Sequence, residues 1–398
     1  MNEVVVREVK LGDIITYNKG YAFKSNEYAD KGKMVVRVTD FTLDSISDND
    51  AVYVSPEDKY RKFIINTGDI LIQTVGSWAN NPNSIVGKIV RVPEKCDNTY
   101  LNQNIVRIIP NKDFNNTYLY YALKANKFSL YCVLRGQGAA NQASITLDTI
   151  FSFKFKAHAF FEQKKIADIL SVYDNLIKNN NKRIKLLEKM AENLYKEWFV
   201  RFRFPGYENL EFVGTLPIGW QYQPISESMD FFDSKRVPLS SKQRDEMEKI
   251  YPYYGAAKLM DYVDNYLFDG EYLLLGEDGT VVTTDGFPVL QLVNDKFWVN
   301  NHAHVIRGKG DISTRFLYLT FCRFPITGVV TGSAQPKISK GRLEKLKILV
   351  PDAITMEHFN NLINPMFDEI NVLKKQLILI TKQRDMLLPR LMSGKLEV

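Results

Sequence analysis

Residues 166–198 read IADILSVYDNLIKNNNKRIKLLEKMAENLYKEW, and apolar side chains recur along this segment at alternating steps of four and three. That spacing is typical of the seam of a left-handed coiled coil. The same register returns 193 residues later, where residues 359–391 read FNNLINPMFDEINVLKKQLILITKQRDMLLPRL. Each seam would extend for about 33 residues, or roughly 50 Å at 1.5 Å per residue. Two such stripes in one chain most simply bury each other.

The seam positions follow from this register. The first helix contributes Ile166, Leu170, Tyr173, Ile177, Asn180, Ile184, Leu187, Leu194 and Trp198. The second contributes Phe359, Ile363, Met366, Ile370, Leu373, Leu377, Ile380, Leu387 and Leu391.

Two seam positions carry polar side chains. Asn180 stands where the second copy has Leu373, and Arg384 stands where the first copy has Ala191. A buried asparagine can fix helix register and orientation at a cost in stability. The arginine can extend to solvent along its aliphatic stem. Partial exposure of both side chains is an equally good interpretation.

The segments that precede the two helices also repeat. Residues 101–108 match residues 299–306 at a shift of 198, and residues 68–72 match residues 270–274 at a shift of 202. Loop insertions account for small drifts in the shift. The chain is therefore interpreted as one unit written twice, with these boundaries: a first globular unit at 1–158, a first long helix at 159–203, a linker at 204–216, a second globular unit at 217–353 and a second long helix at 354–398.

Short strands and polar, glycine-rich loops dominate each globular unit. In the first unit, strands are predicted at 35–38, 69–72, 85–90 and 105–109, with a helix at 118–124. In the second, strands are predicted at 272–275, 289–293 and 304–306, with a helix at 314–321. The expected fold class is α+β, with two strand-rich domains joined and spaced by two long helices.

The linker length sets the expected direction of helix pairing. A parallel pair would require about 15 linker residues to retrace the whole helix near their extended limit of ~3.3 Å each. An antiparallel coiled coil needs only a short connection. We therefore expect a pseudo-twofold internal repeat, with the two globular units at opposite ends of a stiff rod.

Composition sets the broad class of protein. With 398 residues and 45% hydrophobic content, the chain is long enough for two cores. Apolar runs stay short of the ~20 residues of a membrane span, and Met1-Asn2-Glu3 does not resemble a signal peptide, so a cytoplasmic location is expected. Cys96, Cys132 and Cys322 lack metal-ligand spacing and are interpreted as reduced structural thiols.

Charge is distributed unevenly between the two copies. Residues 1–158 carry 20 basic and 16 acidic side chains, whereas residues 204–353 carry 16 and 19. Nonspecific attraction to phosphates therefore cannot be the whole role of this chain. A partner could supply additional basic surface.

Several segments carry a resemblance to a known family. They are LYKEWFVRFRFPG at 194–206, LPIGW at 216–220, GEDGT at 276–280, FWVNNHAHV at 297–305 and GSAQPKI at 332–338. Together with the duplicated plan, they resemble the specificity (S) subunits of type I restriction-modification systems. The first unit departs from the pattern because it lacks the Gly219-Trp220 entry of the second.

The resemblance implies a non-catalytic DNA-recognition subunit of a methyltransferase and endonuclease complex. Each globular unit would be a target-recognition domain for one half of a bipartite site in double-stranded DNA. The helix pair would set the spacer and dock two methyltransferase (modification) subunits, with restriction subunits in the full complex. S-adenosylmethionine is expected on the partner methyltransferase, while this chain is expected to hold no cofactor or metal and to bind no membrane.

Amide, hydroxyl and basic side chains in loops are the candidates for DNA contact, because these groups can bond base edges or phosphates. A self-bonded turn or a solvated loop explains many of them equally well. The first unit contributes Ser77, Trp78, Asn80, Asn81, Asn83, Ser84, Arg135 and Gln137. The second contributes Lys235, Arg236, Lys258, Thr280, Thr283, Thr284, His302 and Lys337.

Other chemistries have weaker support. His302 and His304 alternate like metal ligands, but their counterparts are Asn104 and Val106, so structural or DNA-facing roles are favoured. Glu277-Asp278 could form an acid/base pair, although the first unit has no matching carboxylates. A fused methyltransferase would need a catalytic tetrapeptide and a cofactor loop that the sequence does not offer. A two-headed protein-binding adaptor is permitted by the architecture alone.

Overall fold

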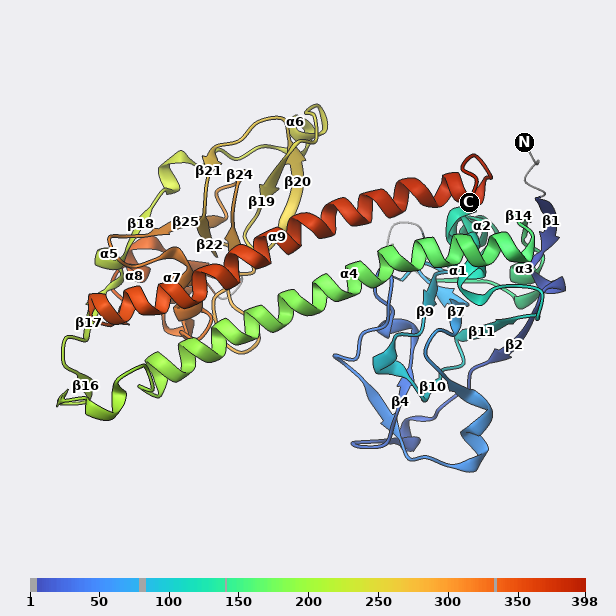
Figure 1. The fold of residues 1–398 in the computed structure, drawn as a ribbon, viewed down its shortest axis with the longest axis horizontal. Helices are drawn as coiled ribbons and strands as arrows, with labels where there is room; N and C mark the ends of the chain where they lie inside the picture. The colour runs from blue at the N-terminus through green and yellow to red at the C-terminus, as the bar shows by residue number, and fades with distance from the viewer. Residues whose placement is uncertain (1–5, 79–83, 140–141, 333–334) are drawn as a thin grey trace. The chain divides into compact units, whose positions relative to one another are not determined.

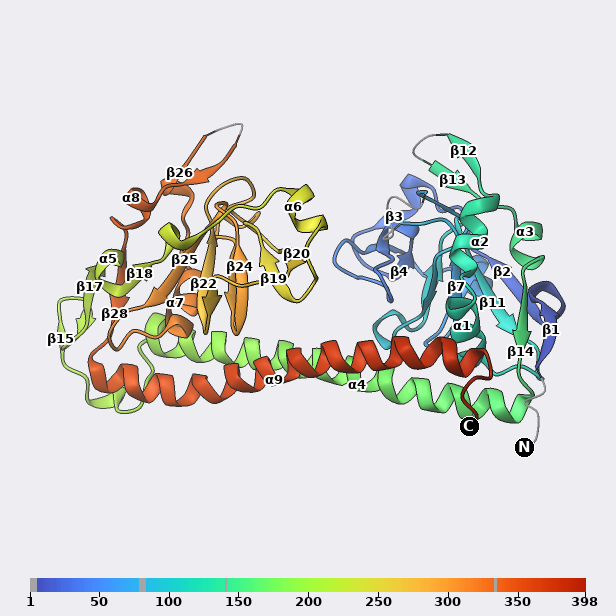
Figure 2. The same cartoon turned by 90° about the horizontal axis from the view of Figure 1, so that it is seen from above.

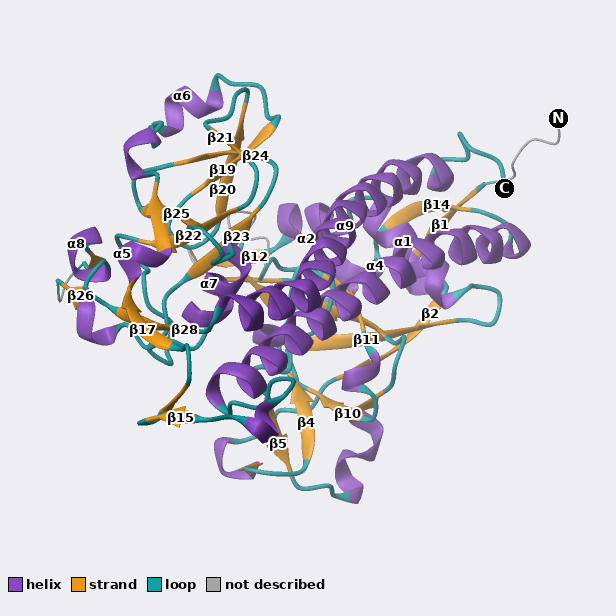
Figure 3. Ribbon diagram, turned by 60° about the vertical axis from the view of Figure 1, so that its left-hand side comes forward, coloured by secondary structure: helices purple, strands orange, loops and turns teal. Residues whose placement is uncertain are grey.

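The computed structural model describes residues 6–78, 84–139, 142–332 and 335–398. The chain forms two compact units, Met1–Lys178 with Ile378–Val398, and Asn179–Leu377. Each unit contains one strand-rich head, the first part of the helix that follows this head, and the last part of the other long helix (Figure 3). The fold class is α+β, as expected.

The first head is built on small sheets. A central sheet has the strand order β2-β11-β7-β9, an outer sheet has the order β3-β5-β4-β10-β6, and β1 pairs with β14. The strands are β1 (Arg7–Lys10), β2 (Ile15–Lys19), β3 (Tyr28–Ala29), β4 (Lys33–Val36), β5 (Val52–Val54), β6 (Ile64–Ile65), β7 (Ile70–Gln73), β8 (Val75–Gly76), β9 (Ile89–Arg91), β10 (Thr99–Leu101), β11 (Ile105–Pro110), β12 (Gln137–Ala139), β13 (Gln142–Ser144) and β14 (Lys154–Ala157). Its helices are α1 (Asn116–Ala125), α2 (Phe128–Arg135) and α3 (Leu147–Phe151).

The second head repeats this plan. Its central sheet has the order β18-β25-β22-β23, its outer sheet has the order β20-β19-β24-β21, and β17 pairs with β28. The strands are β15 (Phe212–Val213), β16 (Leu216–Pro217), β17 (Gln221–Pro224), β18 (Met229–Phe231), β19 (Tyr251–Tyr254), β20 (Leu259–Val263), β21 (Phe268–Asp269), β22 (Tyr272–Gly276), β23 (Leu290–Val293), β24 (Lys296–Val299), β25 (Ala303–Gly308), β26 (Val330–Thr331), β27 (Lys337–Ile338) and β28 (Lys347–Val350). Its helices are α5 (Ile225–Ser228), α6 (Ser241–Asp245), α7 (Thr314–Phe321) and α8 (Lys340–Leu343).

The ladders confirm the internal duplication and correct one part of its alignment. Strands β11 and β25 correspond at the predicted shift of 198. Val106 pairs with Ile72, whereas its counterpart His304 pairs with Leu275. The shift along β7 and β22 is therefore 203 and not 202. A slip of one residue would exchange the two faces of the strand. Because neighbouring residues on both faces are apolar here, similarity of the two sequences alone did not determine the alignment.

One predicted strand is shorter than expected. The sequence suggested residues 85–90, but the ladder of β9 covers only Ile89–Arg91. Gly87 has a positive φ of 75°, and a Cβ at this position would lie 2.2 Å from Cβ of Cys132. The chain turns at Gly87 to pass α2, so a continuous strand through this residue is not possible.

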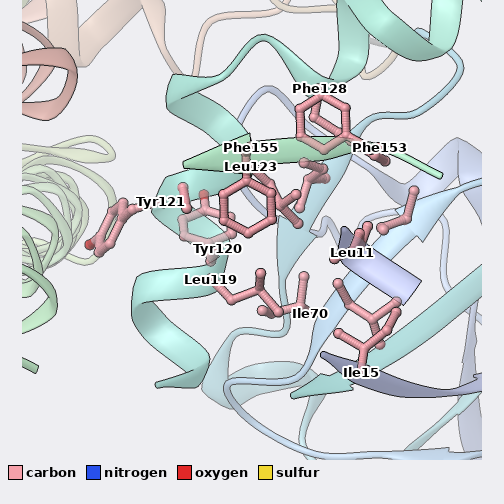
Figure 4. Packing of buried hydrophobic residues seen from close by; sticks show 14 of the residues in the cluster. Leu11, Ile15, Ile70, Leu119, Tyr120, Tyr121, Leu123, Phe128, Phe153 and Phe155 are labelled. Atoms are coloured by element: carbon pink, nitrogen blue, oxygen red, sulfur yellow. The ribbon is translucent and has the colours of Figure 1, made fainter. Parts of the chain in front are cut away.

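The core of the first head lies between its central sheet and the helices. Helix α1 begins where the Asn115 side chain accepts a hydrogen bond from the Tyr118 amide, which satisfies an amide that the helix leaves free. Its apolar side pairs Leu119 with Ile70 of the sheet region, while Tyr121 points away toward α4 (Figure 4). Burial of this apolar surface is the main force that fixes the helix on the sheet.

In the first unit the long helices α4 (Phe160–Tyr195) and α9 (Ala353–Met392) run in opposite directions (Figure 1). Lys165 donates to the carbonyl of Val398, and Arg384 donates to Asp174 at 2.9 Å. Residue numbers thus increase along α4 in the direction in which they decrease along α9, so the two helices are antiparallel. The seam residues of this unit are buried or half-buried, namely Ile166, Leu170, Tyr173, Ile177, Ile380, Leu387 and Leu391.

The second unit holds its own antiparallel segment of the helix pair. The side-chain amide of Asn180 donates to Gln376 at 3.1 Å, and Arg183 pairs with Glu369. Helix α4 ends here in a π-helical turn, Lys196–Val200. The seam residues of this unit are also buried or half-buried, namely Asn180, Ile184, Leu187, Leu194, Trp198, Phe359, Ile363, Met366, Ile370, Leu373 and Leu377.

The two polar seam residues are less exposed than the alternative interpretation of partial exposure predicted. Asn180 is buried, with 4% of its surface exposed. The Arg384 side chain is 13% exposed and does not extend to solvent, because it pairs with Asp174, which also accepts from the Tyr121 hydroxyl. Burial opposes the charge, but hydrogen bonds to Asp174 and Asp385 raise the pKa of Arg384. The ion pair is therefore part of the helix contact.

In the described part of the chain, none of the helices combines the length and apolar character that crossing a bilayer requires. Cys96 and Cys132 are buried and Cys322 is half-buried, and all three are free thiols. Burial raises the pKa of Cys132 to about 12. Such a thiol is a poor nucleophile, in agreement with a structural role.

Candidate nucleic-acid interface

In the first head, the candidate residues gather around a small three-stranded sheet. Its order is β12-β13-β8. Strands β12 and β13 lie on the side of this head that is remote from the long helices α4 and α9 (Figure 2). The Ser77 amide donates to the Ser84 carbonyl at 2.6 Å. A side chain at Gly76 would lie 2.3 Å from the same oxygen. The chain on either side of residues 79–83 is thus held closely together.

Three predicted DNA contacts of this head, Asn80, Asn81 and Asn83, lie outside the described residues. Trp78 is half-buried and packs on the head's core. Arg135, at the end of α2, is exposed, and its guanidinium lies 4.0 Å from the ring centroid of Tyr131. Gln137 is exposed, and its carbonyl accepts from the Ser144 hydroxyl. Gln137 is thus an exposed residue in the first strand of this hairpin, and Arg135 is exposed two residues before it.

The second head carries an equivalent hairpin, β26–β27, on the side remote from its helices (Figure 2). It is attached at the same place in the fold. The Ile338 amide donates to the Glu277 carbonyl at 2.9 Å, as the Ile145 amide donates to the Thr74 carbonyl at 3.0 Å in the first head. Each head therefore presents a hairpin that is fixed to the end of its central strand.

Several predicted contacts of the second head meet around Glu277 and Asp278. Lys337 is half-exposed and lies 3.5 Å from the Glu277 carboxylate. His302 lies 3.6 Å from Asp278, whose other oxygen accepts from Gln335 at 2.8 Å. Thr280 follows on the surface, exposed. Lysine, histidine and glutamine side chains are thus brought together at the base of the hairpin.

Arg236 belongs to the same group but has a supporting position. Its side chain is 12% exposed and donates to the Glu277 carboxylate at 2.6 Å and to the Ala303 carbonyl at 2.7 Å. It also donates to the carbonyl of Asp233. These bonds fill most of its donors inside the protein. Arg236 is therefore placed to brace the site from below.

The other predicted contacts of the second head lie on separate turns. Lys235 is exposed, with its ammonium 5.4 Å from the Phe232 ring centroid. Lys258 is exposed on the turn that Gly255 closes by a bond to its carbonyl. Thr283 and Thr284 are exposed in the turn that ends at Phe287. The fold does not bring these four residues into direct contact with the Glu277 group.

His304 takes a structural position, one of the two roles that the sequence favoured, but its partners were not predicted. It is 1% exposed, with Nδ1 at 2.6 Å from the Asp233 carboxylate and Nε2 at 2.8 Å from the Ile338 carbonyl. Asp233 also accepts from the Val305 amide. Burial would raise the pKa of Asp233, but its bond to His304 and that residue's charge lower it. A useful signal was present, since a histidine replacing Val106 on a buried strand needs buried partners.

The ligand atoms of Asp233, Glu277 and His304 lie within 4.8 Å of one another, a spacing that could hold a cation. Arg236 and Lys337 already place positive charge on Glu277. His304 Nε2 is directed at a carbonyl oxygen. The arrangement is a network of protein charges that needs no metal to be balanced.

Comparisons with known proteins agree with this architecture. Residues 3–189 and 217–371 match a family model described as the type I restriction modification DNA specificity domain. The type I restriction enzyme MjaIX specificity subunit of Methanocaldococcus jannaschii is 27% identical over 322 residues, which cover 75% of this chain and 73% of that protein. The putative MjaX specificity subunit of the same organism is 25% identical over 407 residues, with 99% and 93% covered.

A solved structure shows the same fold. The crystal structure of the type I restriction-modification S subunit from M. genitalium matches with a TM-score of 0.64 at 15% identity, covering 98% of this chain and 97% of that one. The family model spans most of both copies of the repeat. The chain therefore belongs to the family of type I restriction-modification DNA specificity subunits, which are non-catalytic recognition subunits.

Proposed function

We propose that each head reads one half of a bipartite site in double-stranded DNA through the surface around its hairpin. The observation that carries this proposal is that one fold presents two different sets of side chains at equivalent places. At matching ladder positions, Gln137 pairs with Ser144 in the first hairpin, whereas Thr331 pairs with Lys337 in the second. Base readout depends on such side chains, while phosphate contacts fix position only. Different sets would select different sequences.

The helix pair then sets the spacer between the two half-sites. Its seams are apolar and antiparallel in each unit, and long paired helices resist bending more than a loop does. Within this proposal two methyltransferase subunits dock on the chain, and restriction subunits join the full complex. S-adenosylmethionine binds the methyltransferase, so that the present chain contributes recognition and not chemistry. Because the target is chromosomal or invading DNA, the complex would work in the cytoplasm.

The proposal is tested by co-expression of this chain with a type I methyltransferase subunit that assembles with it and mapping of modified adenines across the host genome. We expect one split motif with a constant gap. Insertion of one heptad into both helices, which preserves the seam, adds about 10 Å. It should lengthen the gap by about three base pairs at ~3.4 Å each.

Other outcomes would favour other functions. Modification without sequence preference, in a complex that assembles normally, would favour a protein-binding adaptor. Calorimetric binding of S-adenosylmethionine to the isolated chain would favour a methyltransferase role. A heptad insertion that alters the bases read and leaves the gap constant would contradict the spacer role of the helices.

A further inference from the structure

The two heads fix their hairpins with different chemistry. In the first head, Val106 is buried among apolar neighbours and Thr74 supplies the backbone bond to Ile145. In the second head the corresponding positions are His304 and Glu277. The second hairpin therefore receives a side-chain bond that the first lacks, from His304 Nε2 to the Ile338 carbonyl at 2.8 Å.

Both ring nitrogens of His304 face acceptors. Nδ1 faces the Asp233 carboxylate at 2.6 Å, and Nε2 faces a backbone carbonyl that can only accept. A neutral imidazole has one N–H donor, whereas the imidazolium has two. With Asp233 ionised, as its lowered pKa indicates, only the doubly protonated ring can satisfy both contacts.

Charged groups lie close to one nitrogen of the ring. The Asp233 and Glu277 carboxylates lie 2.6 and 3.6 Å from Nδ1. Arg236 offsets part of their charge at 2.6 Å from Glu277, as does Lys337 at 3.5 Å. The ring of Phe231 lies edge-on to the imidazole at 5.8 Å between centroids, and the Lys340 ammonium lies 4.9 Å from the Phe231 ring centroid. The two carboxylates and the two cations balance each other, so the direct contact of Nδ1 with the Asp233 carboxylate, and not the net charge, is what favours a second N–H on the ring.

Loss of one proton would act on the hairpin first. The ring would keep its N–H toward Asp233, because a hydrogen bond to a carboxylate is stronger than one to a neutral carbonyl. The Nε2 lone pair would then face the Ile338 oxygen, and two acceptors in contact repel. The attachment of β27 to β25 would weaken while the bond to Asp233 persisted.

We propose that His304 is a positioning residue that, when doubly protonated, ties the β26–β27 hairpin to the second head and makes recognition of the second half-site dependent on pH. This inference rests on the proposed function only for its DNA consequence. The first head has Val106 in this position, so its half-site recognition is independent of this proton. Discrimination by the second half should weaken as pH rises.

The first test is spectroscopic and needs no DNA. The chain has four histidines, so the full-length protein labelled with ¹⁵N-histidine gives few imidazole signals, and His304→Gln distinguishes the His304 signal from that of His158, which is also buried. Between pH 5.5 and 9, loss of one His304 proton should coincide with faster exchange of the Ile338 amide. Dividing the exchange rate of the Ile338 amide by that of the Ile145 amide, its equivalent in the first head, removes the intrinsic effect of pH on amide exchange.

The second test uses the methyltransferase complex and DNA carrying the mapped target, or that target with one base changed in either half. Discrimination by the second half should fall about tenfold between pH 6.5 and 8.5, the effect of losing about 1.4 kcal/mol, with discrimination by the first half constant. His304→Gln should remove the pH dependence, and His358→Gln, on an exposed face of α9, should preserve it.

Several results would overturn the proposal. A His304 ring that is singly protonated throughout the titration would do so, as would an Ile338 to Ile145 exchange ratio that ignores the ring's titration. Binding of added Zn²⁺ at Nδ1 would reassign the cluster as a metal site. An equal loss of discrimination in both halves of the site would contradict the role of His304. Absence of sequence discrimination at both pH values would instead contradict the proposed function.

Discussion

The two heads share a sheet order and a hairpin position, yet they bury different groups at the point where the hairpin is attached. The first uses Thr74 and Val106, and the second uses Glu277 and His304 with Asp233 beneath them. The backbone bond is the same in both. The duplicated fold therefore fixes the ladder, and the side chains around it are free to change as long as every buried polar group finds a partner.

The helix contacts show the opposite distribution. In the first unit, Asp174 and Arg384 form a largely buried ion pair. Their counterparts at a shift of 193 are Phe367 and Ala191, both buried and apolar in the second unit. At this pair of helix positions the first unit is ionic and the second is apolar, whereas at the hairpin attachment the first head is neutral and the second is ionic. Neither kind of contact is required by the fold itself.

Breaking the ion pair in the first unit should have the largest effect. Arg384→Ala leaves Asp174 with only Tyr121 in a low-exposure site, and we expect a loss of about 3 kcal/mol in the free energy of unfolding. Urea unfolding monitored by amide exchange within the first unit measures it. The matched control is Arg183→Ala, which removes the exposed pair with Glu369 and should cost less than ~1 kcal/mol. Equal losses in the two variants would contradict the structural role of the pair.

Exchanging the buried hairpin residues should have the next largest effect. Val106→His places an imidazole among apolar neighbours without carboxylate partners, and we expect a loss of about 2 kcal/mol. The ring would stay neutral when folded but protonate when unfolded, so the loss should grow as pH falls below the ordinary histidine range. His304→Val, the reciprocal change, removes a ring that donates to Asp233 and Ile338 when it is doubly protonated, so its loss should likewise be largest at low pH and should shrink as pH rises. Thermal melts from pH 5 to 8 would show both, and a pH-independent Val106→His variant would argue against the apolar environment.

Replacing the polar seam residue should have a smaller effect of opposite sign. Asn180→Leu removes a buried amide, while its partner Gln376 is exposed and can turn to water. We expect the thermal midpoint to rise by about 2–4 °C, equivalent to about 1 kcal/mol, with looser control of helix orientation. Asn179→Leu, on the neighbouring exposed position, should leave the midpoint unchanged. A lower midpoint for Asn180→Leu would place this residue outside the apolar seam.

Much of the fold could be predicted because its signals are periodic. The heptads fixed both helices, and helix α7 was predicted at residues 314–321, where the structure has it. The alignment error of one residue on β7 and β22 arose because consecutive apolar residues, such as Ile70, Leu71 and Ile72, look alike in sequence although they face different cores. Strand pairing distinguishes them, and pairing is not local.

The site was less predictable because its charges come from distant segments. Asp233, Glu277 and His304 are separated by dozens of residues, and only the sheet brings their side chains together. Arg236 was predicted from its charge to contact DNA, whereas its side chain is held among Asp233, Glu277 and Ala303. Charge in a sequence indicates which residues can bind phosphate, but burial decides which of them are free to do so.

The independence of the two heads is tested most directly by exchanging residues 1–158 for the matching head of another specificity subunit and mapping the modified adenines. We predict that one half of the split motif changes while the other half and the gap stay as they were. A motif that changes in both halves would contradict separate reading by the two heads.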